Sequence, residues 1–438
     1  MIFIILIVTF LFSLALSKIL FRRWFNHLSV YSLIWFILLF LYELKLLRYY
    51  DLSTETWFVI ALSYIAFHLG VLFYFSVNKI NKSTEVPVPE LSSNPFFYKQ
   101  GKLLIIVIII TGLVGLVGAL QQWVLLIHRF GSIQKVILSA NSVYKMRVEG
   151  EIQGIAYLPA FAFVSLFFSA LYSAFKRKIT LISVLPFSAI ILKDLANIAR
   201  ALMLFGLIEF TVVFIITVYV LNTEKSPLNR TKKSYWFRFI IIVVVFVICA
   251  SFVRAIKGSV EHYKAASSSI RSLNLFDVIT PSIYLYLSSD VGVLNQYLEH
   301  DNERTGFGEN TFMPIYNILA KFDVVSEPNT YQKGYYIPMW TNTGTYIREL
   351  HADFGVLGVI FGPFLLSFLA TLFWFKFFYS KNIIDLITYT FISIIIFFSF
   401  LVMITRLGNW VIAFTLTIIF YLTIQKIGDS LNKNVERL

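Results

Sequence analysis

Polar side chains gather at the end of a long hydrophilic stretch, directly before an apolar run. The group consists of Asn342, Thr343, Thr345, Arg348, Glu349, His351 and Asp353. Hydroxyl and amide groups can hold sugar hydroxyls, and a carboxylate or an imidazole can take the proton from a reacting hydroxyl. The pattern predicts a sugar-binding site in which Glu349, His351 or Asp353 acts as the general base.

A structural interpretation of the same residues stays open. Asp353 stands just before a helix expected to start near Val356, and aspartate is a favoured N-cap residue. His351 would then be a solvated residue at the membrane boundary. The two interpretations differ in whether these side chains meet a substrate or only support the fold.

Four arginines fall in segments predicted to face one side of a membrane: Arg147, Arg200, Arg254 and Arg348. A guanidinium stays charged at any accessible pH and forms paired hydrogen bonds to phosphate. We predict that Arg147, Arg200 and Arg348 hold a lipid-linked diphosphate as the leaving group and that Arg254 contributes to binding. Alternatively, each arginine reaches toward lipid headgroups or pairs with a carboxylate such as Asp194.

The sequence has no motif for a tightly held metal. No Asp-x-Asp pair occurs in the external segments, no His-x-x-x-His motif occurs anywhere, and Cys249 is the single cysteine. We therefore predict catalysis that depends on arginines, without a metal or another cofactor.

Composition sets the class of protein that must position these residues. The chain has 438 residues, of which 58% are hydrophobic and 14% are charged, and its mean hydropathy is +0.76. Soluble proteins carry roughly 25% charged residues, so a soluble enzyme is excluded. The net charge of +13 lies mostly between apolar runs, where it orients helices, and nucleic acid is not expected as a partner.

Apolar runs predict an all-α polytopic membrane protein with about eleven transmembrane helices. The predicted spans cover residues 2–18, 28–44, 56–77, 103–127, 155–175, 179–195, 200–221, 237–253, 353–375, 385–404 and 409–425. The first run is interpreted as a retained helix because its basic residues, from Lys18 onward, follow the run.

Basic residues predict the orientation of these helices. One set of alternate loops holds 20 Lys and Arg, and the short loops of the other set hold 9. The richer set is assigned to the cytoplasm, which places the N-terminus outside, the C-terminus inside and residues 254–352 in one large external loop. The predicted organisation is residues 1–253 with eight spans, this loop, and residues 353–438 with three spans and a cytoplasmic tail.

Three sequence patterns resemble bacterial O-antigen polymerases of the Wzy type, also called oligosaccharide repeat-unit polymerases. They are Arg147 with Gly150 and Gly154; Arg200 before Gly206; and Asn342, Thr343, Gly344 and Thr345 followed by Asp353, Phe354, Gly355 and Gly358. The family also shares the multi-span topology and a large external loop late in the chain. Its external arginines correspond to Arg147 and Arg200, and to Arg254 and Arg348 in the long loop.

The resemblance implies a metal-independent glycosyltransferase with a GT-C-like fold. It implies transfer of a growing glycan from undecaprenyl diphosphate to a sugar hydroxyl of a new lipid-linked unit, at the outer face of the bacterial inner membrane. Expected partners are the undecaprenyl-diphosphate-linked donor and acceptor, membrane lipid, and a chain-length regulator and flippase of the same pathway. The products expected are O-antigen or capsular-type polysaccharides.

Two other functions stay open from the sequence. An O-antigen ligase would share topology and donor but would use a lipid A core acceptor. A flippase or another transporter of lipid-linked oligosaccharide would need a cavity that reaches the cytoplasmic side, whereas the polar residues here concentrate on the external side.

Overall fold

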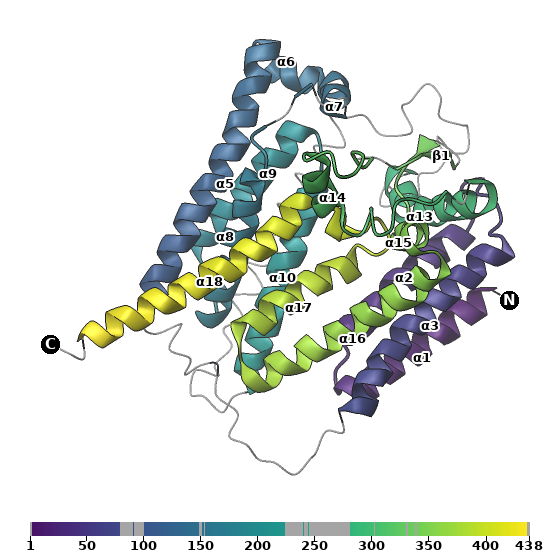
Figure 1. Ribbon diagram of the computed structural model, residues 1–438, viewed down its shortest axis with the longest axis horizontal. Helices are drawn as coiled ribbons and strands as arrows, with labels where there is room; N and C mark the ends of the chain where they lie inside the picture. Colours follow the sequence, from purple (N-terminus) through teal and green to yellow (C-terminus); the bar gives the residue numbers. More distant parts are fainter. Residues whose placement is uncertain are drawn as a thin grey trace. The chain divides into compact units, whose positions relative to one another are not determined.

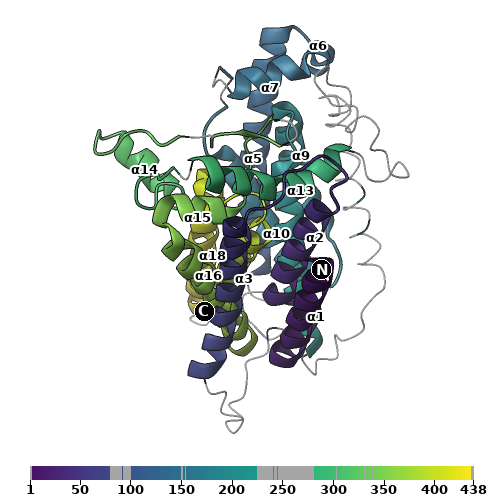
Figure 2. The same cartoon turned by 90° about the vertical axis from the view of Figure 1, so that its right-hand side faces the viewer.

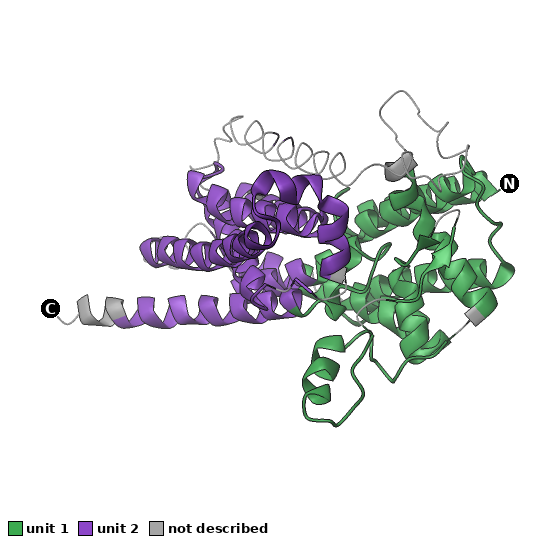
Figure 3. Cartoon of the chain, turned by 90° about the horizontal axis from the view of Figure 1, so that it is seen from above, with its two compact units in different colours: residues 1–84, 259–374, 392–408 green, residues 85–258, 375–391, 409–438 purple. Residues whose placement is uncertain are grey.

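The computed structural model describes most of the chain. The described residues are 2–78, 91, 100–148, 151–152, 154–223, 240, 244, 281–301, 303–329, 332–337 and 340–435. They form two compact units, one made of residues 1–84, 259–374 and 392–408 and the other of residues 85–258, 375–391 and 409–438 (Figure 3).

Long apolar helices dominate the described residues (Figure 1). Seven are long and apolar enough to cross a membrane: α1 (Ile2–Phe21), α3 (Thr54–Val77), α5 (Gly101–Phe130), α8 (Leu158–Phe175), α10 (Ala201–Thr223), α16 (Val356–Ser380) and α18 (Gly408–Val435). Two shorter apolar helices are α2 (His27–Glu43) and α17 (Ile383–Phe397). The prediction of an all-α polytopic membrane protein is confirmed.

The count of eleven spans stays a prediction. The run predicted at 179–195 forms a short 3-10 turn, η2 (Leu181–Ser183), and α9 (Val184–Asn197), which has 14 residues. Apart from residues 240 and 244, the run predicted at 237–253 lies outside the described residues. The span predicted from residue 353 begins later, because α15 (Tyr346–Phe354) precedes it and Gly355, at φ +68°, separates α15 from α16.

Capping explains where the first unit's helices begin. Asn26 accepts the backbone N–H groups of Leu28 and Ser29, and Ser29 Oγ accepts the Asn26 N–H at 3.1 Å, which completes a capping box on α2. The Ser53 hydroxyl caps α3 by accepting the Thr56 N–H at 3.1 Å.

The described part of the predicted external loop belongs to the first unit and is not a separate body. It forms α13 (Pro281–Gln296), the π-helical turn η4 (Tyr297–Asp301), α14 (Met313–Ala320), the strands β1 (Tyr335–Tyr336) and β2 (Trp340–Thr341), and α15. The two strands pair antiparallel, with Tyr335 opposite Thr341. The sequential division at residues 254 and 353 therefore does not follow the compact units.

Buried polar contacts hold this loop onto α2, α3 and their connection. Tyr284 OH donates to the Leu41 carbonyl at 2.5 Å, and Asn295 Oδ1 accepts from the Thr56 hydroxyl at 2.8 Å. The hydroxyl of Tyr346, in the first turn of α15, lies 3.0 Å from Tyr31 OH in α2. Buried hydroxyls need partners, so these pairs define how the loop sits on the spans.

In the second unit, α5 packs closely on α8 through small residues. A Cβ added to Gly115 would lie 2.8 Å from the backbone nitrogen of Ala162, so only glycine permits this approach. Small residues at helix interfaces are typical of membrane proteins. After α5, Gly131 at φ +86° ends the helix and leads into the short helices α6 (Ile133–Leu138) and α7 (Ala140–Val148).

Candidate functional site

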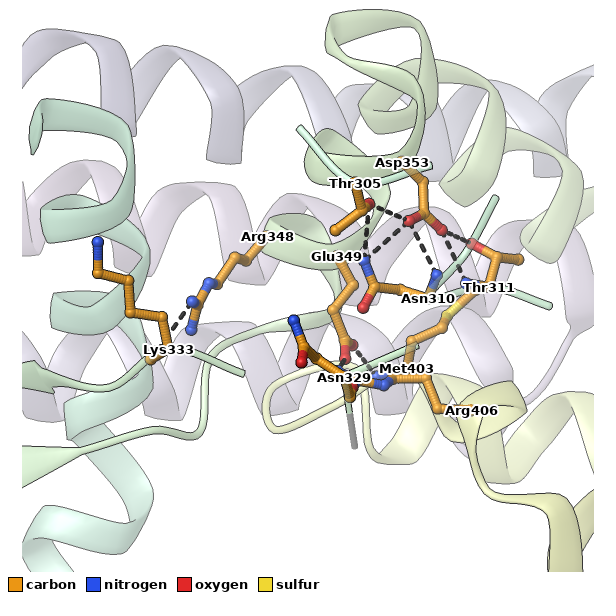
Figure 4. Close-up of polar contacts among 10 residues, drawn as sticks. All are labelled: Thr305, Asn310, Thr311, Asn329, Lys333, Arg348, Glu349, Asp353, Met403 and Arg406. Carbon is orange, nitrogen blue, oxygen red and sulfur yellow. Dashed lines mark hydrogen bonds and ion pairs between the residues drawn. The ribbon is translucent and has the colours of Figure 1, made fainter. Parts of the chain in front are cut away.

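A polar cavity lies within the first unit, where the loop 303–310, the segment near β1, and α15 converge. Its volume is about 120 Å³. Its lining residues are Tyr297, Glu303, Thr305, Glu309, Asn310, Asn329, Gln332, Lys333, Tyr335, Arg348, Ala352 and Arg406. Figure 4 shows the polar contacts around it. Basic, acidic and amide groups together make this space suitable for a charged and hydroxylated ligand.

Arg348, one of the arginines predicted to bind the diphosphate, lines this cavity. The residue is only 5% exposed, and its Nη2 donates to the Lys333 carbonyl at 2.9 Å. Its guanidinium also lies over the rings of Tyr297 and Tyr335, at 5.4 and 5.2 Å from their centroids. Its Nη1 is buried and has no hydrogen-bond partner within the described part of the chain. Burial lowers the pKa of Arg348, and the unsatisfied Nη1 is a donor that an anion could use.

Gly344 explains why the Thr343–Thr345 segment can pass beside this arginine. A Cβ at residue 344 would lie 2.9 Å from Arg348 Cδ and 3.2 Å from Val293 Cγ1. A side chain here would therefore displace the Arg348 stem. The glycine of the third sequence pattern has a packing role that the sequence alone did not indicate.

Glu349 is buried in an ion pair with Arg406. Arg406 Nη1 lies 2.5 Å from Glu349 Oε1, and the Met403 N–H donates to Glu349 Oε2. Arg406 Nη2 also donates to the Asn329 carbonyl at 3.0 Å. Burial raises the pKa of Glu349, and Arg406 opposes that rise. This carboxylate ties α15 to the turn η5 (Ile404–Arg406), and sequence analysis had not paired these two residues.

Asp353 does not cap the following helix, and that interpretation is wrong. Its Oδ1 accepts from the Thr305 hydroxyl and from the N–H and side-chain amide of Asn310, at 2.7 to 2.9 Å. Its Oδ2 accepts from the N–H and hydroxyl of Thr311, both at 2.7 Å. Five donors occupy one carboxylate, so Asp353 acts in this structure as an anchor for the loop 305–311 (Figure 4).

His351 is buried, so the interpretation as a solvated residue is also wrong. It is 2% exposed, its Nδ1 lies 3.1 Å from Tyr297 OH, and the two rings meet edge to face. Arg304 Nη1 donates to the His351 carbonyl at 2.5 Å. Burial, with a smaller effect from Arg304, lowers the pKa of His351 from 6.5 to about 4. The imidazole is therefore neutral at neutral pH.

This lowered pKa predicts acid sensitivity of the fold. Between pH 6.5 and about 4, His351 binds more protons in the unfolded chain than in the folded chain. The contribution of this group to stability is therefore fully present above about pH 6.5 and is lost as the pH falls toward 4, by at most about 3 kcal/mol at ~1.4 kcal/mol per pKa unit. Melting temperatures in detergent should fall more steeply over this range for the native protein than for His351→Asn. Equal slopes would contradict the assignment.

The remaining predicted sugar-binding residues have different environments. Asn342 and Thr343 are exposed, whereas Thr345 is buried with a hydroxyl that has no hydrogen-bond partner. Asp290 of α13 is also buried, and neither of its carboxylate oxygens has a hydrogen-bond partner in the part of the chain that the structure describes. Burial raises the pKa of Asp290, and the Thr343 hydroxyl opposes that rise. In the sequence, the indication of a special role for Asp290 is that it is the one carboxylate in the largely apolar helix α13.

The second unit holds the other predicted arginines around Asp194. This carboxylate is fully buried, and its Oδ2 accepts the Met203 N–H at 2.7 Å. Arg147 and Arg200 both act electrostatically on it, which agrees with the alternative that they pair with a neighbouring carboxylate. Arg147 Nε is buried without a hydrogen-bond partner, and its guanidinium lies over the Tyr144 ring at 5.0 Å. Arg254 lies outside the described residues.

Comparisons with known proteins do not add to this picture. No family model, no curated protein and no solved structure matches the chain. Among the described residues, no three His, Cys, Asp or Glu side chains are close enough to hold a metal ion. The cavity and its side chains are therefore the basis for assigning a function.

Proposed function

We propose that the protein polymerises undecaprenyl-diphosphate-linked oligosaccharide units at the outer face of the bacterial inner membrane. The observation that supports this most is the buried Arg348 guanidinium at the wall of a polar cavity, whose Nη1 has no hydrogen-bond partner among the described residues. An anion with several oxygens would satisfy that donor, and a diphosphate linked to sugars matches the mixed lining of the cavity. The resemblance in sequence supplies the identity of the lipid carrier.

In the proposed reaction, an acceptor sugar hydroxyl attacks the anomeric carbon of the lipid-linked chain. The new glycosidic bond forms as the bond from carbon to phosphate oxygen breaks, and its electron pair stays on the diphosphate. Arg348 stabilises the charge that develops there, which is the type of interaction that enzymes use most effectively. The roles of Arg147 and Arg200 as diphosphate ligands, and of Arg254 as a binding residue, are implied by the resemblance in sequence and stay predictions.

The acceptor proton needs a base, and His351 is our choice among the three predicted residues. Glu349 is fully buried and paired with Arg406, and Asp353 accepts five hydrogen bonds, so both carboxylates already have structural partners. Tyr297 lines the cavity, and its hydroxyl lies 3.1 Å from His351 Nδ1. In this structure the Tyr297 hydroxyl donates to the Glu303 carbonyl at 3.1 Å. In this proposal it turns that proton to His351 as it takes the proton of the sugar hydroxyl. Asn342, Thr343 and Thr345 are proposed to position the sugars.

The direct test is polymerisation by the purified full chain in proteoliposomes. The substrate is a synthetic undecaprenyl-diphosphate-linked repeat unit, and a gel separates the products by length. We expect a ladder of polymers that depends on active protein, with heat-treated protein as the control. Transfer only to added lipid A core would indicate the ligase, and substrate crossing without polymer would indicate the transporter; either result would contradict the proposal.

A further inference from the structure

One segment of the first unit exposes a group of large apolar side chains outside the spanning helices. Residues 306–324 form a hairpin around α14, and its exposed apolar residues are Phe307, Phe312, Ile315, Ile318, Phe322 and Val324. Phe307 is 80% exposed and Phe322 is 72% exposed. In Figure 2, α14 projects from the side of the unit at the level of α15. Contiguous exposed apolar groups of this size mark interaction surfaces.

The hairpin has two different faces. Met313, the first residue of α14, is buried, whereas Ile315 and Ile318 of the same helix are exposed. At 100° per residue, Ile315 and Ile318 lie roughly opposite Met313, and Asn317 lies about 100° from Ile318. The segment also carries few charges, which are Glu309, Lys321 and Asp323. An exposed apolar face that contains Phe and other large apolar side chains is a feature of helices that lie in a membrane interface, and the three charges of this segment lie outside α14.

Internal contacts hold the hairpin in a defined position. Asp353 binds the chain at Thr311, one residue before the hairpin's exposed Phe312, through the N–H and hydroxyl of Thr311. Tyr316 OH donates to the Phe307 carbonyl at 2.8 Å, which closes the hairpin on itself. The apolar side chains are therefore presented outward by a fixed backbone.

The hairpin lies beside the start of the spanning helix α16. The Phe307 ring meets the Phe354 ring edge to face at 4.9 Å between centroids, and the spanning helix α16 begins at Val356. Leu357 and Phe361 on α16 are exposed, each at 63%, as expected for side chains that face lipid. The hairpin's apolar surface therefore begins where the lipid-facing surface of a spanning helix begins.

We propose that the hairpin 306–324 inserts its apolar face into the adjacent leaflet of the bilayer. Continuity with the lipid-facing side of α16 is the reason for choosing lipid over a second protein. Residues Glu309 and Asn310 of the hairpin also line the polar cavity, so insertion would hold the cavity wall against the membrane surface. The proposal concerns lipid contact alone and does not depend on polymerase activity.

The first experiment compares labels at neighbouring positions of α14 in the full chain. In a Cys249→Ala background, which removes the single cysteine, Ile318→Cys and Asn317→Cys are labelled with bimane and reconstituted into phosphatidylethanolamine–phosphatidylglycerol vesicles. Lipids brominated along the acyl chain should cause a larger loss of emission at residue 318 than at residue 317. Aqueous iodide should cause the opposite order. Ile315→Cys should behave like Ile318→Cys.

A second experiment uses the unmodified chain, so it does not depend on the cysteine variants. A lipid that carries a photoreactive diazirine on its acyl chain is activated in the same vesicles, and labelled peptides are identified by mass spectrometry. We expect labelling of residues 312–324 as well as of α16. Two outcomes would overturn the proposal. In the first, iodide quenches both bimane positions equally. In the second, neither quencher reaches either position and the hairpin is not photolabelled.

Discussion

Replacement of Arg348 by alanine is expected to reduce chain growth by about 10²- to 10³-fold, the usual effect of removing one preorganised donor to a developing anion. The guanidinium is buried over the rings of Tyr297 and Tyr335, and its Nη1 has no hydrogen-bond partner among the residues that the structure describes. A substrate phosphate would therefore be its natural acceptor. The measurement is the rate of ladder formation in proteoliposomes that contain equal amounts of folded protein.

Two matched variants make this prediction specific. Arg348→Lys retains the positive charge but loses the planar pair of donors, so we expect growth that is still well below the native rate. Arg129→Ala removes an arginine that is about half exposed and paired with Glu151 at 2.7 Å, and it should leave the rate unchanged. A native rate for Arg348→Ala would show that this cavity is not the site of glycosyl transfer.

Breaking the buried ion pair between Glu349 and Arg406 is expected to cause the largest loss of stability. Both side chains are at most 5% exposed, so Glu349→Gln removes the carboxylate charge that faces the buried Arg406 guanidinium. Losses of ~3–5 kcal/mol are typical when one partner of a buried pair is removed. The free energy of unfolding in mixed micelles is the quantity to measure. Because Glu349 also accepts the Met403 N–H, the variant should loosen the contact between α15 and η5.

A double variant separates the charge effect from packing. Replacing both residues, as Glu349→Leu with Arg406→Met, removes both buried charges and should be less destabilising than Glu349→Gln alone. Glu151→Gln breaks the exposed pair with Arg129 and should change stability by no more than ~1 kcal/mol. If Glu349→Gln and Glu151→Gln had the same small effect, the Glu349–Arg406 pair would not be the buried support that we describe.

The spans were predictable because each depends on a local property. A spanning helix satisfies its own backbone hydrogen bonds and needs only a long apolar run, so α3, α5, α8, α10 and α16 lie close to their predicted positions. Helix boundaries near the loop were less accurate. Gly355 at φ +68° divides a continuous pattern into α15 and α16, and the sequence does not show that left-handed backbone directly.

The roles of the residues before α16 depended on partners far away in the chain. Glu349 meets Arg406 from beyond the next two helices, Asp353 meets Thr305 and Asn310, and His351 meets Tyr297. The distance between such residues along the chain does not predict that they meet. They come together only when the loop packs on α2 and α3. The sequence places these side chains near one another in the chain, but it does not show which distant group each of them meets.

The sequence by itself determined that this is an all-α membrane protein and that its unusual polar residues lie in a long segment between spans. Those conclusions follow from hydrophobicity, which is a property of each residue and its near neighbours. Only the tertiary structure decided that Glu349 and Asp353 are occupied while Arg348 retains an unsatisfied Nη1 at a cavity. Whether a polar group is free depends on which other groups burial places beside it, and that is decided by the whole fold.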